Sequence, residues 1–335
     1  RPLDGDEVNL VHLGNNPYHD WIVPLLDRPR TVVVMHDLVH HHLLVERTLA
    51  RGDRAAYEAG IRAAHGRHGA VLARARRYDL TGARDPFLFP ARRAVLAAAT
   101  AVVVHSPWAA ERVRRDLGDR PVLQVHLPVA DPGPVDREAA RRDLGMAPEE
   151  VVLMHLGFLT REKGVQEVVT AVATAARLGA PVRLVLVGEG VFADRLASAA
   201  RGVGVADRLH ATGWVGIEAL RRLPAAADLG VVLRTPSAGE TSAAVLRFLA
   251  CATPAAVSAL PQFLDWPWEA APRVTPGPSA AAELTRTILR IAGDRGQWAS
   301  RRQAARGVYE AHHRPEQVAA ELVRGLRAVF SDLAA

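Results

Sequence analysis

Short apolar, β-branched runs alternate with alanine- and arginine-rich stretches along the chain. This alternation predicts an α/β fold, in which parallel strands are covered by helices. In the first half, we expect helices over about 53–77 and about 90–99. The predicted strands of this half are Val8–Leu13, Thr31–Met35, Ala101–His105 and Pro121–His126.

The second half repeats the pattern more cleanly. Helices are expected over about 164–178 and about 240–250, and long amphipathic segments beyond Pro278 predict a helical carboxyl terminus. The predicted strands are Val151–Leu156, Arg183–Val187, Leu209–Thr212, Leu229–Leu233 and Pro254–Ser258. In open parallel sheets, ligands bind outside the carboxyl ends of the strands, so the loops at those ends are the candidate sites.

A proline-rich segment divides the chain. Leu127–Pro134 holds three prolines and a glycine, which is typical of a linker. A length of 335 residues also suggests two domains. We therefore expect one domain over residues 1–130, a second over 131–310, and a carboxyl-terminal helix over 311–335.

Composition limits the class of protein. Hydrophobic residues make up 49% of the chain and the mean hydropathy is +0.02, which excludes a disordered chain. The longest strongly apolar stretch, Ala94–Val104, is far shorter than the roughly 20 residues of a membrane-spanning helix. The start lacks the apolar region of a signal peptide. The single cysteine, Cys251, excludes an internal disulfide. These features predict a cytoplasmic protein.

The chain is basic, with 42 Lys+Arg against 36 Asp+Glu. Acidic residues are interleaved with the arginines, which is typical of solvated helix faces, and no nucleic-acid-binding motif is present. We expect no specific nucleic-acid partner, and the charge leaves a peripheral contact with anionic membranes open. Lys163 is the only lysine of the chain.

The first candidate site is Gly157–Gly164, between a predicted strand and a predicted helix, and Lys163 is its last residue but one. A cation just before a helix opposes the helix dipole, so it is poorly placed for stability. It is well placed for an anion, because free N–H groups and the ammonium can converge on a phosphate. We favour phosphate binding over an ordinary surface lysine.

The second candidate site is Thr235–Ser242, where Gly239 permits close approach of a ligand and Glu240 is expected to open a helix. A helix also favours a first-turn glutamate for its own stability, so this segment alone leaves both readings open.

The third candidate site is His36–His42, where His36 follows a predicted strand. The consecutive histidines 40–42 point in different directions on a helix, and no carboxylate or cysteine set completes a site, so no metal is expected. Use of His36 as a polar or acid–base group is the preferred hypothesis. Asn15 and Asn16 line a ligand cleft or serve the turn before Pro17.

Together these segments resemble the family 4 retaining glycosyltransferases of GT-B fold, over nearly the whole chain. No single motif is decisive, but the order and spacing are specific. The resemblance is carried by His12–His19, Val32–Asp37, Val103–Ser106, Gly157–Gly164, Val185–Gly190, Gly239–Glu240 and Leu249–Pro254.

The resemblance implies two Rossmann-like domains facing a cleft, with the acceptor side in residues 1–130 and the nucleotide-sugar donor bound mainly by 131–310. It implies transfer of a sugar from a nucleotide-diphosphate sugar with retention of configuration, without metal or cofactor. The acceptor is left open as a sugar, a lipid-linked molecule or a small molecule.

The resemblance also assigns roles to single residues. His36 and Glu240 match the histidine and the first E-x7-E glutamate near the donor sugar, and are the expected catalytic residues. Lys163 matches the lysine on the diphosphate, and Thr241 and Ser242 are expected beside the phosphates. The other expected donor-binding residues are Gly157, Gly188, Gly239, Trp214 and Val215, the last two at the base, and the acceptor-side candidates are Asn15, Asn16 and Asp37.

The chain departs from the family in three ways. The second glutamate of E-x7-E is replaced by Phe248, or by Arg247 in the alternative alignment. Phe158 stands where many members have an arginine. The family's first βα units are missing, so we expect a truncated amino-terminal domain. These departures motivate one alternative, a non-catalytic GT-B partner subunit or binding protein. A GT-B nucleotide-sugar epimerase is the alternative within enzymes.

Overall fold

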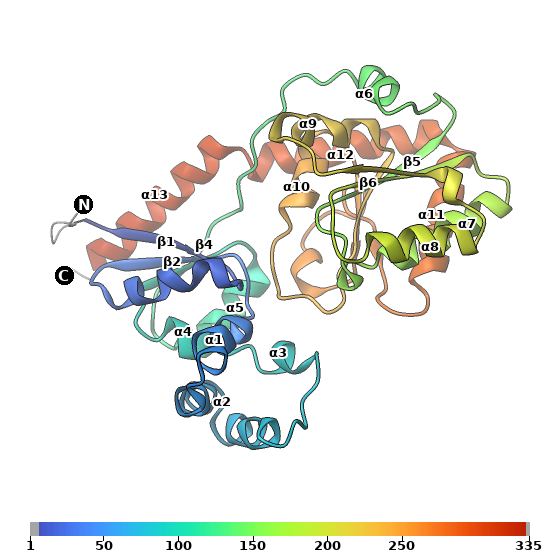
Figure 1. Cartoon of the computed structure of the whole chain (residues 1–335). Helices are drawn as coiled ribbons and strands as arrows, with labels where there is room; N and C mark the ends of the chain where they lie inside the picture. The colour runs from blue at the N-terminus through green and yellow to red at the C-terminus, as the bar shows by residue number, and fades with distance from the viewer. Residues whose placement is uncertain (1–6, 333–335) are drawn as a thin grey trace. The chain divides into compact units, whose positions relative to one another are not determined.

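The structure is a computed structural model that describes residues 7–332. Its contacts form two compact units (Figure 1). The first unit comprises the residues up to Leu127, the loop Pro236–Thr241 and the residues from Ala319 onward. The second comprises Pro128–Thr235 and Ser242–Val318. Each unit contains a parallel sheet with helices on it, so the predicted α/β class is confirmed.

The first unit is built on a four-stranded sheet of order β1-β2-β3-β4, and all its neighbouring strands are parallel. Every residue of β2 and β3 is buried, because both strands are runs of small apolar side chains covered on two faces. These strands confirm the predicted ones to within two residues at each end. Their bounds are β1 Asn9–Leu13, β2 Thr31–Met35, β3 Ala101–Val104 and β4 Val122–Gln124.

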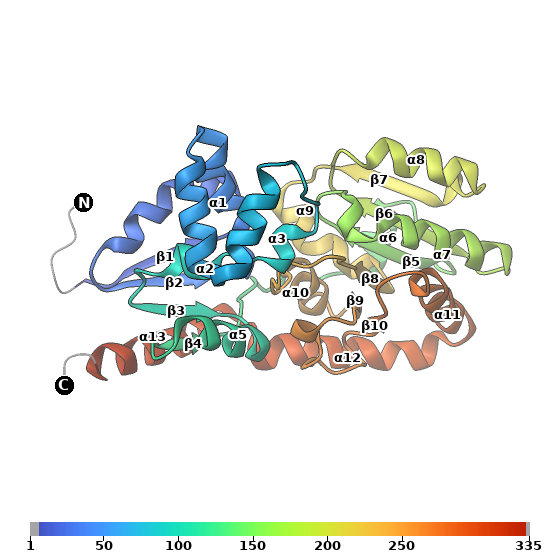
Figure 2. The ribbon, with the colours of Figure 1, turned by 90° about the horizontal axis from the view of Figure 1, so that it is seen from below.

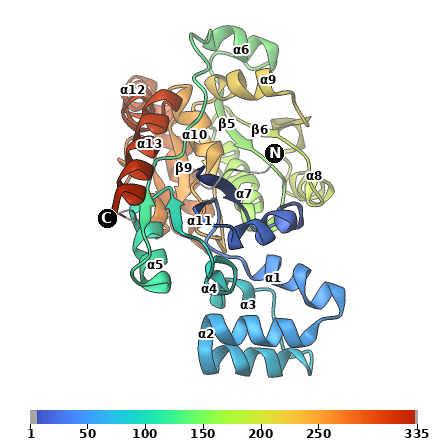
Figure 3. The ribbon, with the colours of Figure 1, turned by 90° about the vertical axis from the view of Figure 1, so that its left-hand side faces the viewer.

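The helix predicted over about 53–77 is present as α2 (Arg54–Arg76), but it folds back on itself at Gly66. Gly66 has φ 57° and ψ −135°, and a Cβ placed on Gly69 would lie 2.1 Å from the carbonyl oxygen of Ile61. The two arms therefore touch backbone to backbone (Figure 3). The other helices of this part are η1 Pro17–Asp27, α1 His41–Arg47, η2 Leu49–Arg51, α3 Asp85–Leu88, α4 Arg92–Leu96 and α5 Pro107–Leu117.

The last helix, α13 (Pro315–Asp332), lies against β4 of the first unit (Figure 2). The Glu321 carboxylate is 3.2 Å from Nδ1 of His126, just after β4. The side chain of Leu123 lies 3.1 Å from where a Cβ on Gly325 would stand. Helix α13 thus covers the β4 edge of the first sheet.

The second unit holds a six-stranded parallel sheet of order β10-β9-β8-β5-β6-β7. Its first strand, β5, is central. Two strands follow on one side, and the chain then crosses to the other side at β8. The bounds are β5 Val151–Leu156, β6 Val182–Val187, β7 Leu209–Gly213, β8 Leu229–Val232, β9 Ala255–Ser258 and β10 Arg273–Val274. This is the strand order of nucleotide-binding sheets, with the change of direction between β5 and β8.

Apolar helices cover this second sheet, and α7 and α11 pack together over one face with a continuous core. No helix among residues 7–332 is both long enough and apolar enough to cross a bilayer. The remaining elements of the second unit are α6 Arg137–Asp143, η3 Arg161–Lys163, α7 Val165–Arg177, α8 Ala193–Gly202, η4 Ala206–Arg208, α9 Ile217–Arg222, η5 Leu223–Ala226, α10 Ala243–Ala250, η6 Pro261–Phe263, α11 Ala280–Gly293 and α12 Arg295–His312.

Candidate functional site

The predicted Gly157–Gly164 site lies at the carboxyl end of β5, at the change of direction in the second sheet. The loop is tied to the neighbouring strand ends by two backbone hydrogen bonds, Gly157 N to Val187 O at 2.9 Å and Leu159 N to Glu189 O at 2.8 Å. Ligands of such sheets bind at this point, so the loop lies where a binding site is expected.

The glycines of this corner are required by close backbone contact. A Cβ on Gly188 would lie 2.3 Å from the carbonyl oxygen of Gly157, and a Cβ on Gly190 would lie 2.3 Å from that of Leu159. Gly157 itself has φ +116°, and Lys163 Nζ is 3.6 Å from where its Cβ would stand. The ammonium therefore lies directly over the bare backbone of the loop.

Lys163 ends the 3-10 turn η3, and Gly164, at φ 62°, is the N-cap of α7. Beneath them His155 is fully buried in β5. Burial, with smaller contributions from the charges of Lys163 and then Arg234, lowers the pKa of His155 to about 4. The ring is therefore neutral at pH 7, and the corner carries its positive charge on Lys163 and Arg234.

Arg234 is a candidate site residue that the sequence analysis missed. It lies two residues after the end of β8, and its backbone N–H donates to Ser258 Oγ at 2.8 Å. On either side of it, Thr235 N donates to Glu162 O at 2.8 Å, and the Leu233 side chain lies 2.9 Å from where a Cβ on Gly164 would stand. A charged residue at the end of an apolar strand was the signal that could have identified it.

The helix expected from Glu240 starts later. The structure begins α10 at Ala243 with Ser242 as its N-cap, so Glu240 and Thr241 lie in the preceding loop. Gly239 lies in the same loop and adopts φ +77°. The Ser242 hydroxyl is buried, and within residues 7–332 its Oγ has no hydrogen-bond partner. An unsatisfied hydroxyl at a helix N-terminus is suited to a phosphate oxygen.

Glu240 is held in the Pro236–Thr241 loop, which belongs to the first unit. Ser237 Oγ donates to Glu240 Oε2 at 2.8 Å and accepts from Gly239 N at 3.0 Å. The loop also accepts a backbone hydrogen bond from Leu38 N, at 2.7 Å from the Ala238 oxygen. Glu240 thus lies on a loop that pairs with the segment just after His36, the other predicted catalytic residue.

His36 follows β2, and its Nε2 is 3.0 Å from Nδ1 of His12. Burial lowers the pKa of His36 to about 4, with smaller contributions from His105, His12 and His19. The ring is therefore neutral at pH 7 and able to accept a proton.

The acceptor-side candidates take local structural roles. The Asp37 carboxylate accepts from Asn15 N at 2.8 Å, and Asn15 Nδ2 is 2.7 Å from Nδ1 of His42. Asn16 caps η1 by accepting from Tyr18 N at 3.0 Å. Asn15, Asp37 and His42 therefore form one polar cluster, and Asn16 is a helix cap.

The histidine run does not assemble a ligand set. His41 is engaged at both ring nitrogens, with Phe89 O at 2.7 Å and the Tyr57 hydroxyl at 3.0 Å. His40 is buried, and burial lowers its pKa to about 3. Among the residues that the structure describes, no three His, Cys, Asp or Glu side chains are grouped as a metal would need.

Trp214 and Val215 directly follow β7. The Trp214 side chain is 77% exposed, and its backbone N–H donates to Glu189 Oε1 at 3.2 Å. The β6 and β7 loops are thereby joined beside the corner, and the indole is left open to a ring that could stack on it.

Neither alignment restores the second glutamate. Phe248 is fully buried, and its ring fills the space over Gly230 of β8, 2.5 Å from where a Cβ would stand. Arg247 is half-buried, and desolvation together with Arg221 lowers its pKa.

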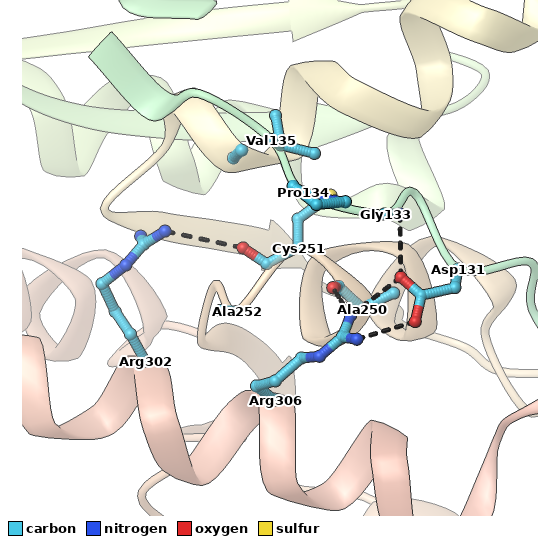
Figure 4. A pocket seen from close by; sticks show the side chains of 10 residues that line it. Asp131, Gly133, Pro134, Val135, Ala250, Cys251, Ala252, Arg302 and Arg306 are labelled. Atoms are coloured by element: carbon cyan, nitrogen blue, oxygen red, sulfur yellow. Dashed lines mark hydrogen bonds and ion pairs between the residues drawn. The ribbon is translucent and has the colours of Figure 1, made fainter.

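A cavity of about 490 Å³ lies elsewhere in the second unit, between residues 131–135, Ala225, residues 250–252 and α12 (Figure 4). Arg306 pairs with Asp131 at 2.7 Å, and Arg302 donates to the Cys251 carbonyl at 3.5 Å. Its arginines are already engaged by the protein, and none of the predicted site residues lines it.

The sequence of the second unit matches known transferases. Residues 150–294 match the family model described as glycosyl transferases group 1. The chain is 27% identical over 167 residues to 2-deoxystreptamine glucosyltransferase of Streptomyces kanamyceticus, covering 49% of this chain and 42% of the relative. It is 35% identical over 125 residues to GDP-mannose-dependent alpha-(1-6)-phosphatidylinositol dimannoside mannosyltransferase of Mycobacterium tuberculosis, covering 36% and 31%. The chain thus spans less than half the length of these relatives.

Solved structures share the fold over nearly the whole chain. Sucrose-phosphate synthase from Thermosynechococcus elongatus superposes with a TM-score of 0.70 at 20% identity, covering 97% of this chain and 74% of that one. HepE from Anabaena in complex with UDP gives 0.64 at 15% identity, covering 96% and 100%. At such identities the likeness concerns the fold alone. Residues 150–294 are thus similar in sequence to the group 1 glycosyl transferases, and the chain shares its two-unit α/β fold with these solved structures.

Proposed function

We propose that the chain transfers a sugar from a nucleotide-diphosphate sugar to a hydroxyl acceptor with retention of configuration and without a metal. One observation carries the proposal: Lys163 and Arg234 lie on the loops that follow β5 and β8, at the change of direction in the second sheet. The named relatives support the reaction class, because two of them are a glucosyltransferase and a GDP-mannose-dependent mannosyltransferase.

In this proposal, the second unit binds the diphosphate. Lys163 Nζ lies over the open backbone of Gly157, Arg234 adds a second cation, and the Ser242 hydroxyl offers an unused hydrogen bond. Arg234 then takes the role of the cation that Phe158, 74% exposed, cannot supply. Fixed cations and a helix N-terminus stabilise the charge that develops on a departing diphosphate.

The sugar hydroxyls are assigned to Glu240, whose carboxylate is held in place by Ser237 at 2.8 Å. Attack by the acceptor on the same face that the diphosphate leaves gives retention and requires no protein nucleophile. The neutral His36 is the candidate to receive the acceptor's proton.

The test is a transfer assay. Purified protein is incubated with a panel of UDP- and GDP-sugars and hydroxyl acceptors, and the anomeric configuration of the product is read by NMR. The proposal predicts an α-linked product from an α-linked donor and loss of transfer in Glu240→Ala. The exposed Glu218→Ala variant serves as the matched control. Inversion of configuration, or full transfer by Glu240→Ala, would contradict the proposal.

Arg234 is tested separately by comparing nucleotides. If it holds the diphosphate, Arg234→Gln weakens binding of the nucleoside diphosphate about tenfold or more, as expected for a charge-assisted hydrogen bond. Binding of the matching nucleoside is unchanged. Equal weakening of both ligands would instead indicate a general disturbance of the β8 loop.

The same preparations separate the alternatives. An epimerase converts the nucleotide-sugar in the absence of any acceptor, whereas a transferase requires one. A non-catalytic GT-B partner subunit would bind no nucleotide-sugar detectably in a calorimetric titration. The replacement of the second glutamate by the buried Phe248 is the observation that keeps this second alternative under test.

A further inference from the structure

Three histidines lie in a row across the first sheet, one at the carboxyl end of each of three neighbouring strands. His12 is in β1, His36 follows β2 and His105 follows β3. The strand register produces this row, because β1 and β2 pair His12 with Val34 and Leu13 with Met35. The ring centroids are 5.2 Å apart for His12 and His36, and 5.4 Å for His36 and His105.

His12 and His36 are joined by a hydrogen bond between their rings. Nδ1 of His12 is 3.0 Å from Nε2 of His36, and the ring planes differ by only 20°. With centroids 5.2 Å apart, a nitrogen–nitrogen distance this short places the two rings side by side. The bond therefore lies close to both ring planes, where an imidazole N–H donates best.

The protonation states follow from the surroundings. Burial lowers the pKa of His36 to about 4, and the pKa of His12 is lowered by burial and by His19. Both rings are neutral at pH 7, so one proton is shared between Nδ1 of His12 and Nε2 of His36. His105 donates from Nδ1 to Val125 O at 2.9 Å, which fixes its tautomer.

The hydrogen-bonded pair of His12 and His36 reaches from a half-buried position to the solvent. His36 is half-buried and His12 is exposed. The titratable groups that act on the pair are His105 and His19, and neither carries a negative charge that would trap a proton on it.

We propose that His12 is a proton relay for His36, an inference that rests on the proposed function. His36 starts with its proton on Nε2, donated to His12. As the acceptor oxygen bonds to the anomeric carbon and the carbon–diphosphate bond breaks, the acceptor's proton moves to Nδ1 of His36. The Nε2 proton moves to Nδ1 of His12, and His12 releases its Nε2 proton to water. The diphosphate keeps the electron pair of the broken bond, and exchange with water restores the starting tautomers.

The decisive comparison is between two replacements of His12. The side-chain oxygen of His12→Asn can accept the hydrogen bond in place of Nδ1 but cannot pass a proton on, whereas His12→Ala removes both functions. The relay predicts that each variant lowers kcat at least tenfold with little change in KM, and that added imidazole restores His12→Ala. His68→Ala, a replacement of an exposed histidine in α2, is the matched control and retains full kcat.

A merely structural role gives a different result: His12→Asn then transfers at the wild-type rate, imidazole has no effect, and the relay is refuted. In the free protein, ¹⁵N-histidine NMR at pH 7 should show a neutral His36 whose imidazole nitrogen signals shift in His12→Ala. Absence of the hydrogen bond between the rings also refutes the relay, whatever the activity. If the wild type transfers no sugar but shows this hydrogen bond, the failure lies in the proposed function.

Discussion

Replacing Gly188 tests the geometry of the diphosphate corner. In Gly188→Ala the new Cβ would lie 2.3 Å from the carbonyl oxygen of Gly157, and the residue would have to keep φ +131°. Backbone strain of this kind costs about 1–3 kcal/mol. Forced displacement of well-packed neighbours costs a further 1–3 kcal/mol or so. The expected loss of unfolding free energy is therefore about 2–6 kcal/mol.

The control is Gly179→Ala, where φ is +88° but nothing lies within 4 Å of the new Cβ. This variant carries the conformational cost alone, about 1–2 kcal/mol. Urea and thermal unfolding of both variants give the difference, which corresponds to roughly 2–4 °C in Tm for each kcal/mol. Equal losses in the two variants would refute the close contact between Gly188 and Gly157.

Three further predictions concern the second unit. Asp228 accepts from Arg137 at 2.6 Å and from Val152 N at 2.8 Å, so Asp228→Ala should destabilise the fold by about 3–5 kcal/mol in urea unfolding, against well under 1 kcal/mol for the exposed Glu218→Ala. Burial raises the pKa of Cys251 to about 12, so a thiol reagent should label the native protein slowly. In urea the same reagent should label one thiol per chain, and fast labelling of the native protein would contradict the burial of Cys251. His155 has a pKa of about 4 in the folded protein against 6.5 in the unfolded chain, so the unfolded chain binds a proton first as the pH falls. The free energy of unfolding should therefore fall as the pH drops from 6.5 to 4, and it should fall less in His155→Asn.

The fold was largely predictable from the sequence. Apolar runs such as Thr31–Met35 and Val151–Leu156 are buried over their whole length, and period and composition are sufficient to identify such strands. The folding back of α2 at Gly66 was not predictable, because a glycine inside a helical pattern does not by itself end the helix. The late start of α10 was missed for a related reason, since the Ser237–Glu240 hydrogen bond competes with a first helical turn.

The part of the candidate site that lies in one continuous segment of the sequence could be predicted. The Gly157–Gly164 corner is continuous in sequence, and its lysine is unique in the chain. The proposed roles of Arg234 and His12 were missed because they depend on neighbours from other strands. The register between β1 and β2 and the order of β5 and β8 bring these neighbours together, and a single sequence does not state either one.

The central claim is that the corner around Lys163 binds the diphosphate of a sugar nucleotide. Calorimetric titration of UDP and GDP into the wild type, Lys163→Ala and Arg161→Ala tests it most directly, because Arg161 is an exposed cation in the same 3-10 turn. We predict that one of the two nucleotides binds, that Lys163→Ala weakens it by about tenfold or more, and that Arg161→Ala changes it by less than about twofold. Binding that Lys163→Ala leaves intact, or no binding of either nucleotide, would contradict the account.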